Sequence, residues 1–264
     1  MARAPRKQSD RNRGLSRRTL LVGGGAAAGL LIAWGVWPRS YAPNLNAGPT
    51  ETIVNAFLKI DRSGQIIVIV PQTEMGQGVT TVLPQILADE LGADWRTVAV
   101  QSAPISPLYA NDLLARQWLA NDWTRMLGDA GDWAIGQYAT RSALMLTGGG
   151  TSVPMFHDAY RDAGAAARVL LCKAAAARWG GDWESCATAD GFVMRDGQRL
   201  RFAELAAEAA EHRVPEALPL RSEGPRLTGQ SLPRLDTPAR STAPPISLPT
   251  SACPAWCSPR SARG

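Results

Sequence analysis

Short apolar runs bounded by turn residues predict strands in the first half of the chain. Residues 56–60 and 66–70 lie on either side of the turn sequence Asp61-Arg62-Ser63-Gly64, and this pattern predicts a β-hairpin. Residues 97–100 form another apolar run and predict a third strand. Residues 41–51, which precede the hairpin and contain two prolines, are predicted to be a linker.

A helical period appears between these strands. Within residues 79–91 the apolar positions recur at spacings of three and four, which indicates one buried helix face: Val79, Val82, Leu83, Ile86, Leu87 and Leu91. Gly92 is a natural end for this helix. Pro84 lies inside it and predicts a kink or a later helix start, because proline lacks a backbone N–H.

The second half of the chain alternates helical and hairpin patterns. Residues 110–145 carry three tryptophans and an amphipathic pattern; core packing is the ordinary role of such residues, and a membrane-surface or subunit contact is the alternative. A long helix is predicted over residues 155–179, and its small residues 164–167 would let another element pack closely. A hairpin over residues 192–200 and a short helix over residues 202–212 follow. The mixture predicts an α+β fold.

The charge of the chain is concentrated at its N-terminus. The net charge is +5, but residues 1–18 carry seven basic residues and one acid, so the remaining 246 residues sum to −1. No basic surface is left to explain, and we expect no nucleic-acid partner. The four cysteines and two histidines do not form a disulfide framework or a metal-binding pattern, so no metal site is expected, and His157 is expected to be solvated or to cap a helix.

The N-terminal segment has the order of an export signal. Arg17 and Arg18 stand in the sequence Ser-Arg-Arg-Thr-Leu-Leu-Val, and an uncharged apolar stretch follows over residues 19–38. That stretch is long enough to span a bilayer, which needs about 20 residues, and Trp34 and Trp37 suit an interfacial position. We therefore predict that residues 1–40 are a twin-arginine signal or a membrane anchor, with the rest of the chain on the periplasmic side. The alternative is a chance arginine pair before an ordinary membrane helix.

Two glycine-rich turns each precede a predicted helix. Residues 72–78, with the sequence Gln-Thr-Glu-Met-Gly-Gln-Gly, would direct backbone N–H groups and the positive end of a helix at one point, where a phosphate can bind. Glycine permits a close approach of the backbone, and Gln77 adds a side-chain amide. A tight turn without a ligand is the alternative. Residues 148–152 form the second turn, in which Thr151 or Ser152 can cap the long helix.

These features together resemble one family. The turn at residues 72–78, the helix that ends in Asp-Glu-Leu-Gly-Ala-Asp-Trp, and the turn at residues 148–152 followed by residues 164–168 resemble the xanthine dehydrogenase and aldehyde oxidase family, in the branch of the isoquinoline 1-oxidoreductase beta subunit. The resemblance covers residues 54–240, with residues 113–146 as an insertion. It implies that one set of residues contacts a molybdopterin cofactor (Gly76, Gln77 and Gly78) and that a second set does so more weakly (Gly149, Gly150, Thr151 and Ser152).

The resemblance also implies an activity and partners. The activity is hydroxylation of an N-heterocycle, such as isoquinoline, or oxidation of an aldehyde, with oxygen taken from water. The cofactor is molybdenum-molybdopterin in its cytosine dinucleotide form, and the cofactor performs the redox chemistry while the protein positions it. The partners are a small subunit with [2Fe-2S] clusters, the twin-arginine translocase and the inner membrane.

The last residues of the chain change character. Residues 241–264 contain five prolines, five serines and no acid, and a disordered tail is the ordinary interpretation. When the reading frame of this tail is offset, however, the permitted translation resembles the stretch that the family places after a segment like residues 235–239. We therefore predict a frameshift at or just before Arg240, which would leave the family's catalytic glutamate out of this chain and the chain inactive alone. Nucleotide sequencing tests this, because stop codons in the offset frame soon after codon 264 would contradict it.

The sequence thus predicts a fragment of a molybdopterin-binding domain, with mixed strands and packed helices over residues 52–240, preceded by a signal or anchor helix. Three functions are compatible with it. The first is the N-terminal part of a molybdenum hydroxylase large subunit. The second is a non-catalytic, membrane-anchored fragment or pseudogene product, and the third is a periplasmic anion-binding protein.

Overall fold

The computed structural model describes residues 39–222 and 226–237. Several predicted features lie outside the described residues: Arg17 and Arg18 of the export pattern, the apolar stretch 19–38, and the tail 241–264 with the proposed frameshift. In the ranges that are described, no helix combines the length and the apolar character needed to cross a membrane.

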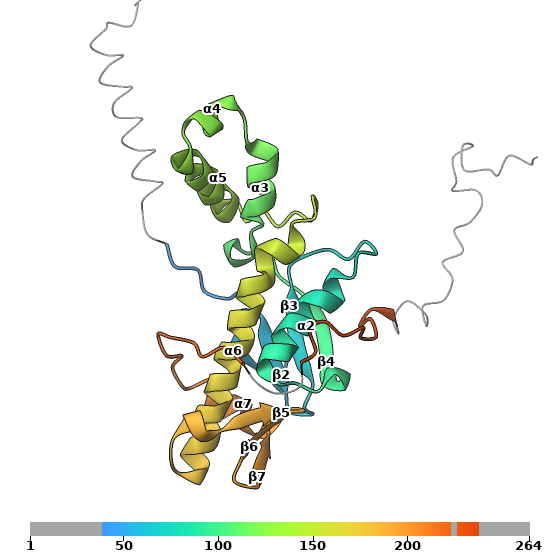
Figure 1. Cartoon of the computed structure of the whole chain (residues 1–264), viewed down its shortest axis with the longest axis vertical. Helices are drawn as coiled ribbons and strands as arrows, with labels where there is room; N and C mark the ends of the chain where they lie inside the picture. Colours follow the sequence, from blue (N-terminus) through green and yellow to red (C-terminus); the bar gives the residue numbers. More distant parts are fainter. Residues whose placement is uncertain (1–38, 223–225, 238–264) are drawn as a thin grey trace, which may run out of the picture.

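A four-stranded sheet forms the centre of the molecule (Figure 1). Its strands lie in the order β1 (Glu51–Asn55), β2 (Leu58–Asp61), β3 (Ile66–Val70) and β4 (Val98–Ser102). The first three are antiparallel, and β3 and β4 are parallel. The predicted hairpin and third strand are confirmed; β1 was not predicted, and all its residues are only half-buried.

Both faces of β3 are covered, which explains its uninterrupted apolar sequence. Ile66, Val68 and Val70 belong to the main core, whereas Ile67 and Ile69 belong to a smaller cluster on the opposite face. The 3₁₀ turn η2 (Pro107–Tyr109) contributes to that smaller cluster, and the 3₁₀ turn η1 (Trp95–Thr97) leads into β4.

Helix α2 (Val79–Leu91) connects β3 to β4 and packs against the long helix α6 (Ser152–Trp179). The predicted end of α2 is confirmed, because Gly92 adopts a left-handed conformation there. The helix begins at Val79 and includes Pro84, so the predicted later start is wrong. The predicted close-packing face of α6 is confirmed at Gly164, where an added Cβ would lie 2.6 Å from the Leu87 carbonyl oxygen.

A second, three-stranded sheet lies beyond the C-terminal half of α6 (Figure 1). It consists of β5 (Ala187–Ala189), β6 (Phe192–Arg195) and β7 (Gln198–Arg201), and α7 (Phe202–Ala209) follows it and packs against α6. The predicted second hairpin and short helix are confirmed. Strand β5 and the 3₁₀ turn η3 (Trp183–Ser185) before it were not predicted.

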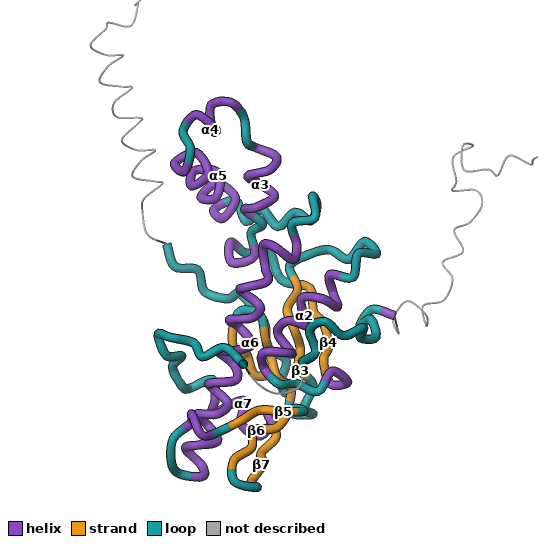
Figure 2. Tube along the Cα trace, viewed as in Figure 1, coloured by secondary structure: helices purple, strands orange, loops and turns teal. Residues whose placement is uncertain are grey.

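A helical insertion projects from the opposite end of the molecule (Figures 1 and 2). It contains α3 (Asp112–Leu119), α4 (Asp122–Met126) and α5 (Asp129–Arg141), and its own small core is built from Ala115, Ile135 and Ala139. Trp118 and Trp133 are 62% and 47% exposed, so core packing is the wrong prediction for both. The physical reason is the size of that core, because a cluster of small side chains between short helices has no room for an indole.

Candidate functional site

The bend at residues 72–78 is organised around the carboxylate of Glu74. The Gly76 and Gly78 N–H groups donate to Oε1 at 2.8 and 3.0 Å, and the Thr80 N–H and hydroxyl donate to Oε2 at 3.1 and 3.0 Å. The bend thus directs its amides at one anion, as the sequence predicts for the start of a helix. That anion is a side chain of the same segment.

Glu74 is also held from the other side of the bend by Arg234, which no sequence pattern singled out. Arg234 donates to Glu74 Oε1 at 3.0 Å and to the Gly76 carbonyl oxygen at 3.1 Å, and its guanidinium pairs with Asp236 at 2.9 Å. Burial raises the pKa of Glu74, but the hydrogen bonds from Gly78, Thr80 and Gly76 outweigh it and lower that pKa to about 2. Glu74 is therefore a permanent anion at neutral pH.

The Gln77 side chain closes the bend on itself. Its Nε2 donates to the Thr73 carbonyl oxygen at 2.8 Å, and its Oε1 accepts from the Met75 N–H at 2.5 Å. Gly76 and Gly78 have φ angles of 106° and 84°, and an added Cβ at either glycine would meet no atom within 4 Å. The backbone of the bend therefore faces open space.

The second glycine-rich turn lies directly beside the first. The Thr73 N–H donates to Thr147 Oγ1 at 2.9 Å, and the Ser152 hydroxyl donates to Gln72 Oε1 at 2.8 Å. Both candidate cofactor segments are thus brought together, although about 70 residues separate them in the sequence. Gln72, which is buried, and Thr147 are the residues that link them; the sequence patterns gave neither a role, and only their position next to glycine-rich turns could have pointed to them.

The start of α6 is free of side-chain caps, which corrects the capping prediction for Thr151 and Ser152. Thr151 Oγ1 instead donates to the Gly148 carbonyl oxygen and accepts from the buried amide of Asn111, both at 2.8 Å. Within the described residues, the Ser152 and Val153 N–H groups have no hydrogen-bond partner. The positive end of this 28-residue helix is consequently open beside Gly150, over which an added Cβ would also meet nothing within 4 Å.

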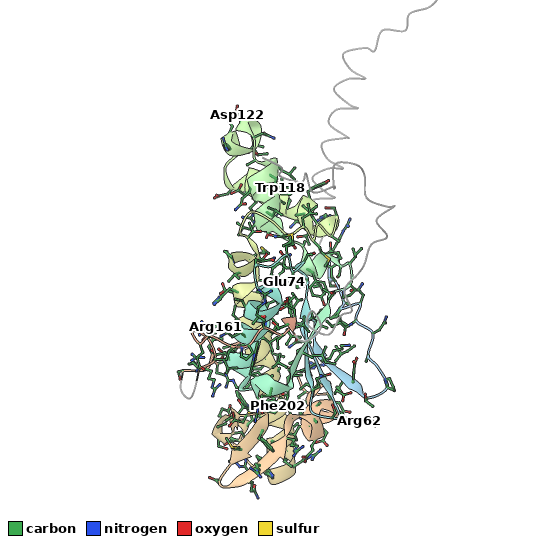
Figure 3. All side chains as sticks on the ribbon, turned by 90° about the vertical axis from the view of Figure 1, so that its right-hand side faces the viewer. Arg62, Glu74, Trp118, Asp122, Arg161 and Phe202 are labelled. Carbon is green, nitrogen blue, oxygen red and sulfur yellow. The ribbon has the colours of Figure 1, made fainter. Side chains whose placement is uncertain are left out.

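Exposed apolar side chains occur on the segments that form the two turns and on the adjoining helix α3. Met75 projects from the first turn, Leu146 and Val153 flank the second, and Trp118 of α3 reaches within 3.5 Å of where a Cβ on Gly148 would be. Along the long axis of the molecule, Glu74 lies between Trp118 and Arg161 of α6 (Figure 3). Such exposed apolar side chains are typical of surfaces that bind a ligand or another protein segment.

The remaining candidates provide no redox or metal chemistry. His157 is exposed and its Nδ1 lies 2.8 Å from Asp158, in agreement with the prediction of a solvated histidine. The described ranges contain no group of three or more metal-binding side chains. Cys172 is buried, and burial raises the pKa of its thiol to about 12, so it stays protonated.

Two joined glycine-rich turns at helix starts, one with an open anion-binding end, define a class of proteins that bind a phosphate-bearing cofactor. Residues 6–107 match the family model described as the molybdopterin cofactor-binding domain. The predicted family relationship is confirmed, and the chain is a relative of molybdopterin-binding oxidoreductase subunits.

Three curated relatives share similar levels of identity with the chain. The beta subunit of isoquinoline 1-oxidoreductase from Brevundimonas diminuta is 30% identical over 210 residues, which are 78% of this chain and 23% of that protein. The membrane-bound aldehyde dehydrogenase (pyrroloquinoline-quinone) of Gluconacetobacter polyoxogenes is 29% identical over 72% of this chain and 21% of its own length. The B component of nicotinate dehydrogenase from Pseudomonas putida is 30% identical over 81% and 16%.

Among solved structures, quinoline 2-oxidoreductase from Pseudomonas putida 86 is similar, with 21% identity over 61% of this chain and 17% of that chain and a TM-score of 0.32. The chain spans less than a quarter of the length of the curated relatives it matches.

Proposed function

We propose that this chain is part of the large subunit of a molybdenum hydroxylase and that its two joined turns, residues 72–78 and 148–152, hold part of the molybdopterin cofactor. The observation that carries the proposal is the pair of hydrogen bonds that joins the turns, Thr73 to Thr147 and Ser152 to Gln72. The family match of residues 6–107 supports the identity of the cofactor.

The residues of the site fit the cofactor in a division of labour that differs from the sequence hypothesis. That hypothesis gave the phosphate to the amides of Gly76 and Gly78, which here donate to Glu74. The open amides are those of Ser152 and Val153, at the start of the longest helix. We therefore assign the phosphate-bearing end of the cofactor to the start of α6, and we assign the uncharged part of the cofactor to the open glycine backbone of the first turn.

When bound, this cofactor supplies oxidation of an electron-poor carbon with oxygen from water, and the residues of this chain bind and orient it. The substrate class that we propose is an N-heterocycle or an aldehyde, because the names of the relatives contain isoquinoline, nicotinate and aldehyde. A [2Fe-2S] subunit as electron acceptor, the cytosine dinucleotide form of the cofactor, and twin-arginine export to the periplasm, with or without a retained membrane anchor, are parts of the same proposal. We assign no catalytic base within the described residues.

Cofactor analysis of a charge variant tests the assignment. The chain is produced in a molybdenum-replete host, and molybdenum and pterin are measured per mole of purified protein. Val153→Glu places a carboxylate among the open amides of α6, where an acid also favours the helix by about 0.3–1 kcal/mol. We expect this variant to fold and to lose the cofactor. Val214→Glu makes the same change on an exposed loop and should retain it.

One observation favours the second candidate, a non-catalytic protein without a cofactor. The Glu74 carboxylate already satisfies the start of α2, so the first turn is stable without any ligand. A folded wild-type chain without molybdenum or pterin, under conditions that load a related hydroxylase, would support this candidate. Recovery of pyrroloquinoline quinone, which the name of the aldehyde dehydrogenase relative contains, would contradict the molybdopterin assignment directly.

A further inference from the structure

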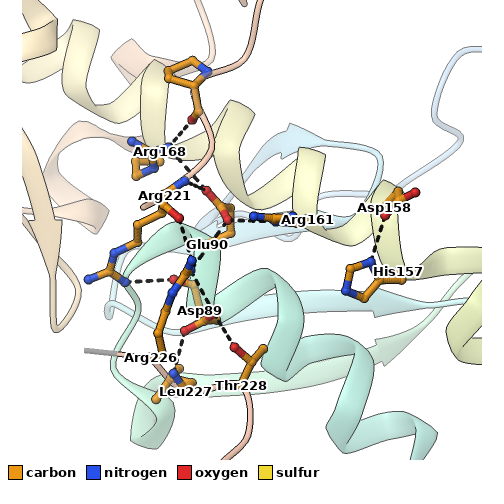
Figure 4. Close-up of polar contacts among 11 residues, drawn as sticks. Asp89, Glu90, His157, Asp158, Arg161, Arg168, Arg221, Arg226, Leu227 and Thr228 are labelled. Carbon is orange, nitrogen blue, oxygen red and sulfur yellow. Dashed lines mark hydrogen bonds and ion pairs between the residues drawn. The ribbon is translucent and has the colours of Figure 1, made fainter. Parts of the chain in front are cut away.

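The end of α2 carries two adjacent buried acids. The side chains of Asp89 and Glu90 are 6% and 1% exposed, and both lie in the last turn of the helix, where the macrodipole disfavours negative charge. Buried carboxylates require compensating cations. Arginines from two other segments provide that compensation (Figure 4).

Helix α6 contributes Arg161 and Arg168, which each approach Glu90 to 3.4 Å. The segment that packs along α2 contributes Arg221 and Arg226; Arg226 lies 3.2 Å from Asp89, and the Arg221 guanidinium donates to the Asp89 carbonyl oxygen at 2.9 Å. Four guanidinium groups thus surround two carboxylates. The cluster holds more positive charge than its own acids neutralise.

The two acids leave donors of this cluster unused. Asp89 also accepts from the Leu227 N–H at 2.6 Å and from the Thr228 hydroxyl at 2.7 Å, so Arg226 supplies only part of its compensation. Within the described residues, Arg161 makes one polar contact, through Nε, and both of its terminal nitrogens are without a partner. A guanidinium with two open nitrogens is the donor that binds an oxyanion in a bidentate manner.

A cavity of about 180 Å³ opens at this point. Its lining includes Arg161, Arg226, Thr228 and His157. His157 lies four residues before Arg161 and therefore on the same face of α6. Its Nδ1 contacts Asp158, which leaves Nε2 for a ligand, as Figure 4 shows.

We propose that this cavity binds a phosphate group through Arg161, Arg226 and His157. The site does not depend on the proposed redox function, because none of these residues belongs to the two glycine-rich turns. The volume accommodates one phosphate and little more, so the ligand is free phosphate or the terminal group of a phosphomonoester that extends through the open side.

The test is a calorimetric titration of the full chain with inorganic phosphate at constant ionic strength, with chloride as the balancing anion. We expect saturable binding of one phosphate, and we expect Arg161→Gln to weaken it by about tenfold or more, as loss of a charge-assisted contact does. Arg178→Gln is the matched control, because Arg178 lies on the same helix with a side-chain exposure of 37% against 38% for Arg161 and pairs with Glu208 outside the cavity. It should bind phosphate as the wild type does.

A second variant protects the test against misfolding. His157→Gln changes a 47% exposed side chain, so the fold is retained and phosphate affinity should still fall. A parallel titration with glycerol 3-phosphate identifies the source, since tighter binding than inorganic phosphate indicates a phosphomonoester. Absence of saturable binding, or an equal loss of affinity in the Arg178 variant, overturns the proposal.

Discussion

Glu74 determines the shape of the first turn at the scale of a single residue. Its carboxylate gathers the N–H groups of Gly76, Gly78 and Thr80, which would otherwise be unsatisfied at the start of α2. A charged acceptor of several backbone hydrogen bonds is worth more than a neutral one. The turn therefore owes its stability to Glu74, and the glycines provide only the positive φ angles.

Replacing Glu74 with glutamine tests this role. The folded-state pKa of about 2 lies below the ordinary value of 4.5, so the carboxylate stabilises the fold at pH 4.5 and above, and this contribution is lost as the pH falls from 4.5 to 2. We expect Glu74→Gln to lower the free energy of unfolding by about 2 kcal/mol at pH 7. The deficit should disappear near pH 2.

The measurement is urea denaturation of both proteins across this pH range. Glu211→Gln is the control, because Glu211 is exposed and forms no salt bridge within the described residues. A Glu74 variant as stable as the wild type at pH 7 would show that the turn is held by other contacts.

At the scale of elements, local patterns predicted what local physics decides. The ends of α2 and the two hairpins follow from Gly92 and from the turn residues between strands, which act within a few positions of the chain. Each glycine-rich turn was also visible. Their contact through Gln72 and Ser152 was not, because it depends on how α6 lies against α2 over a separation of 80 residues.

The occupancy of the first turn was missed for a different reason. Glu74 stood inside the quoted motif, but sequence alone does not show that its side chain folds back on Gly76 and Gly78. Arg234 could not be assigned to the turn either, since 160 positions separate it from Glu74. Long-range polar contacts of this kind leave no periodic signal in the sequence.

The contact between α2 and α6 depends on the absence of a side chain at Gly164. An added Cβ would lie 2.6 Å from the Leu87 carbonyl oxygen and 2.9 Å from the Glu90 Cβ, and neither atom can move without moving α2. Alanine favours a helix over glycine by about 1 kcal/mol, but overpacking typically costs about 1–3 kcal/mol. We expect Gly164→Ala to be destabilising in thermal unfolding.

Gly136→Ala in α5 is the opposing control. Its Cβ would meet the nearest atoms at 3.4 and 3.5 Å, both at the far ends of flexible side chains, so the helix preference should prevail and raise the stability by about 0.5–1 kcal/mol. If both substitutions change the stability in the same direction, close helix packing at Gly164 is not what holds the two elements together.

At the scale of the whole molecule, the insertion and the body are separate packing units. The insertion has its own core, and its two ends meet where the Asn111 N–H donates to the Leu144 carbonyl oxygen at 2.8 Å. Exposure of Trp118 and Trp133 leaves the alternative from the sequence, a membrane or subunit contact, as a prediction. The frameshift at Arg240 also stays a prediction, which nucleotide sequencing across that codon tests.

Deletion of the insertion should therefore separate the fold from the site. With residues 112–143 replaced by two glycines, the ends stay within hydrogen-bonding distance of each other, and the main core between the sheet, α2 and α6 loses no member. We expect a single cooperative unfolding transition, lowered by less than about 5 °C, which corresponds to 1–2 kcal/mol for a domain of this size. The second turn should respond more strongly, because Leu114 and Gln117 of α3 lie against Gly148 and Gly149. Hydrogen exchange should accelerate at residues 147–153 and stay unchanged in β3, whereas loss of the cooperative transition would mean that the insertion is part of the core.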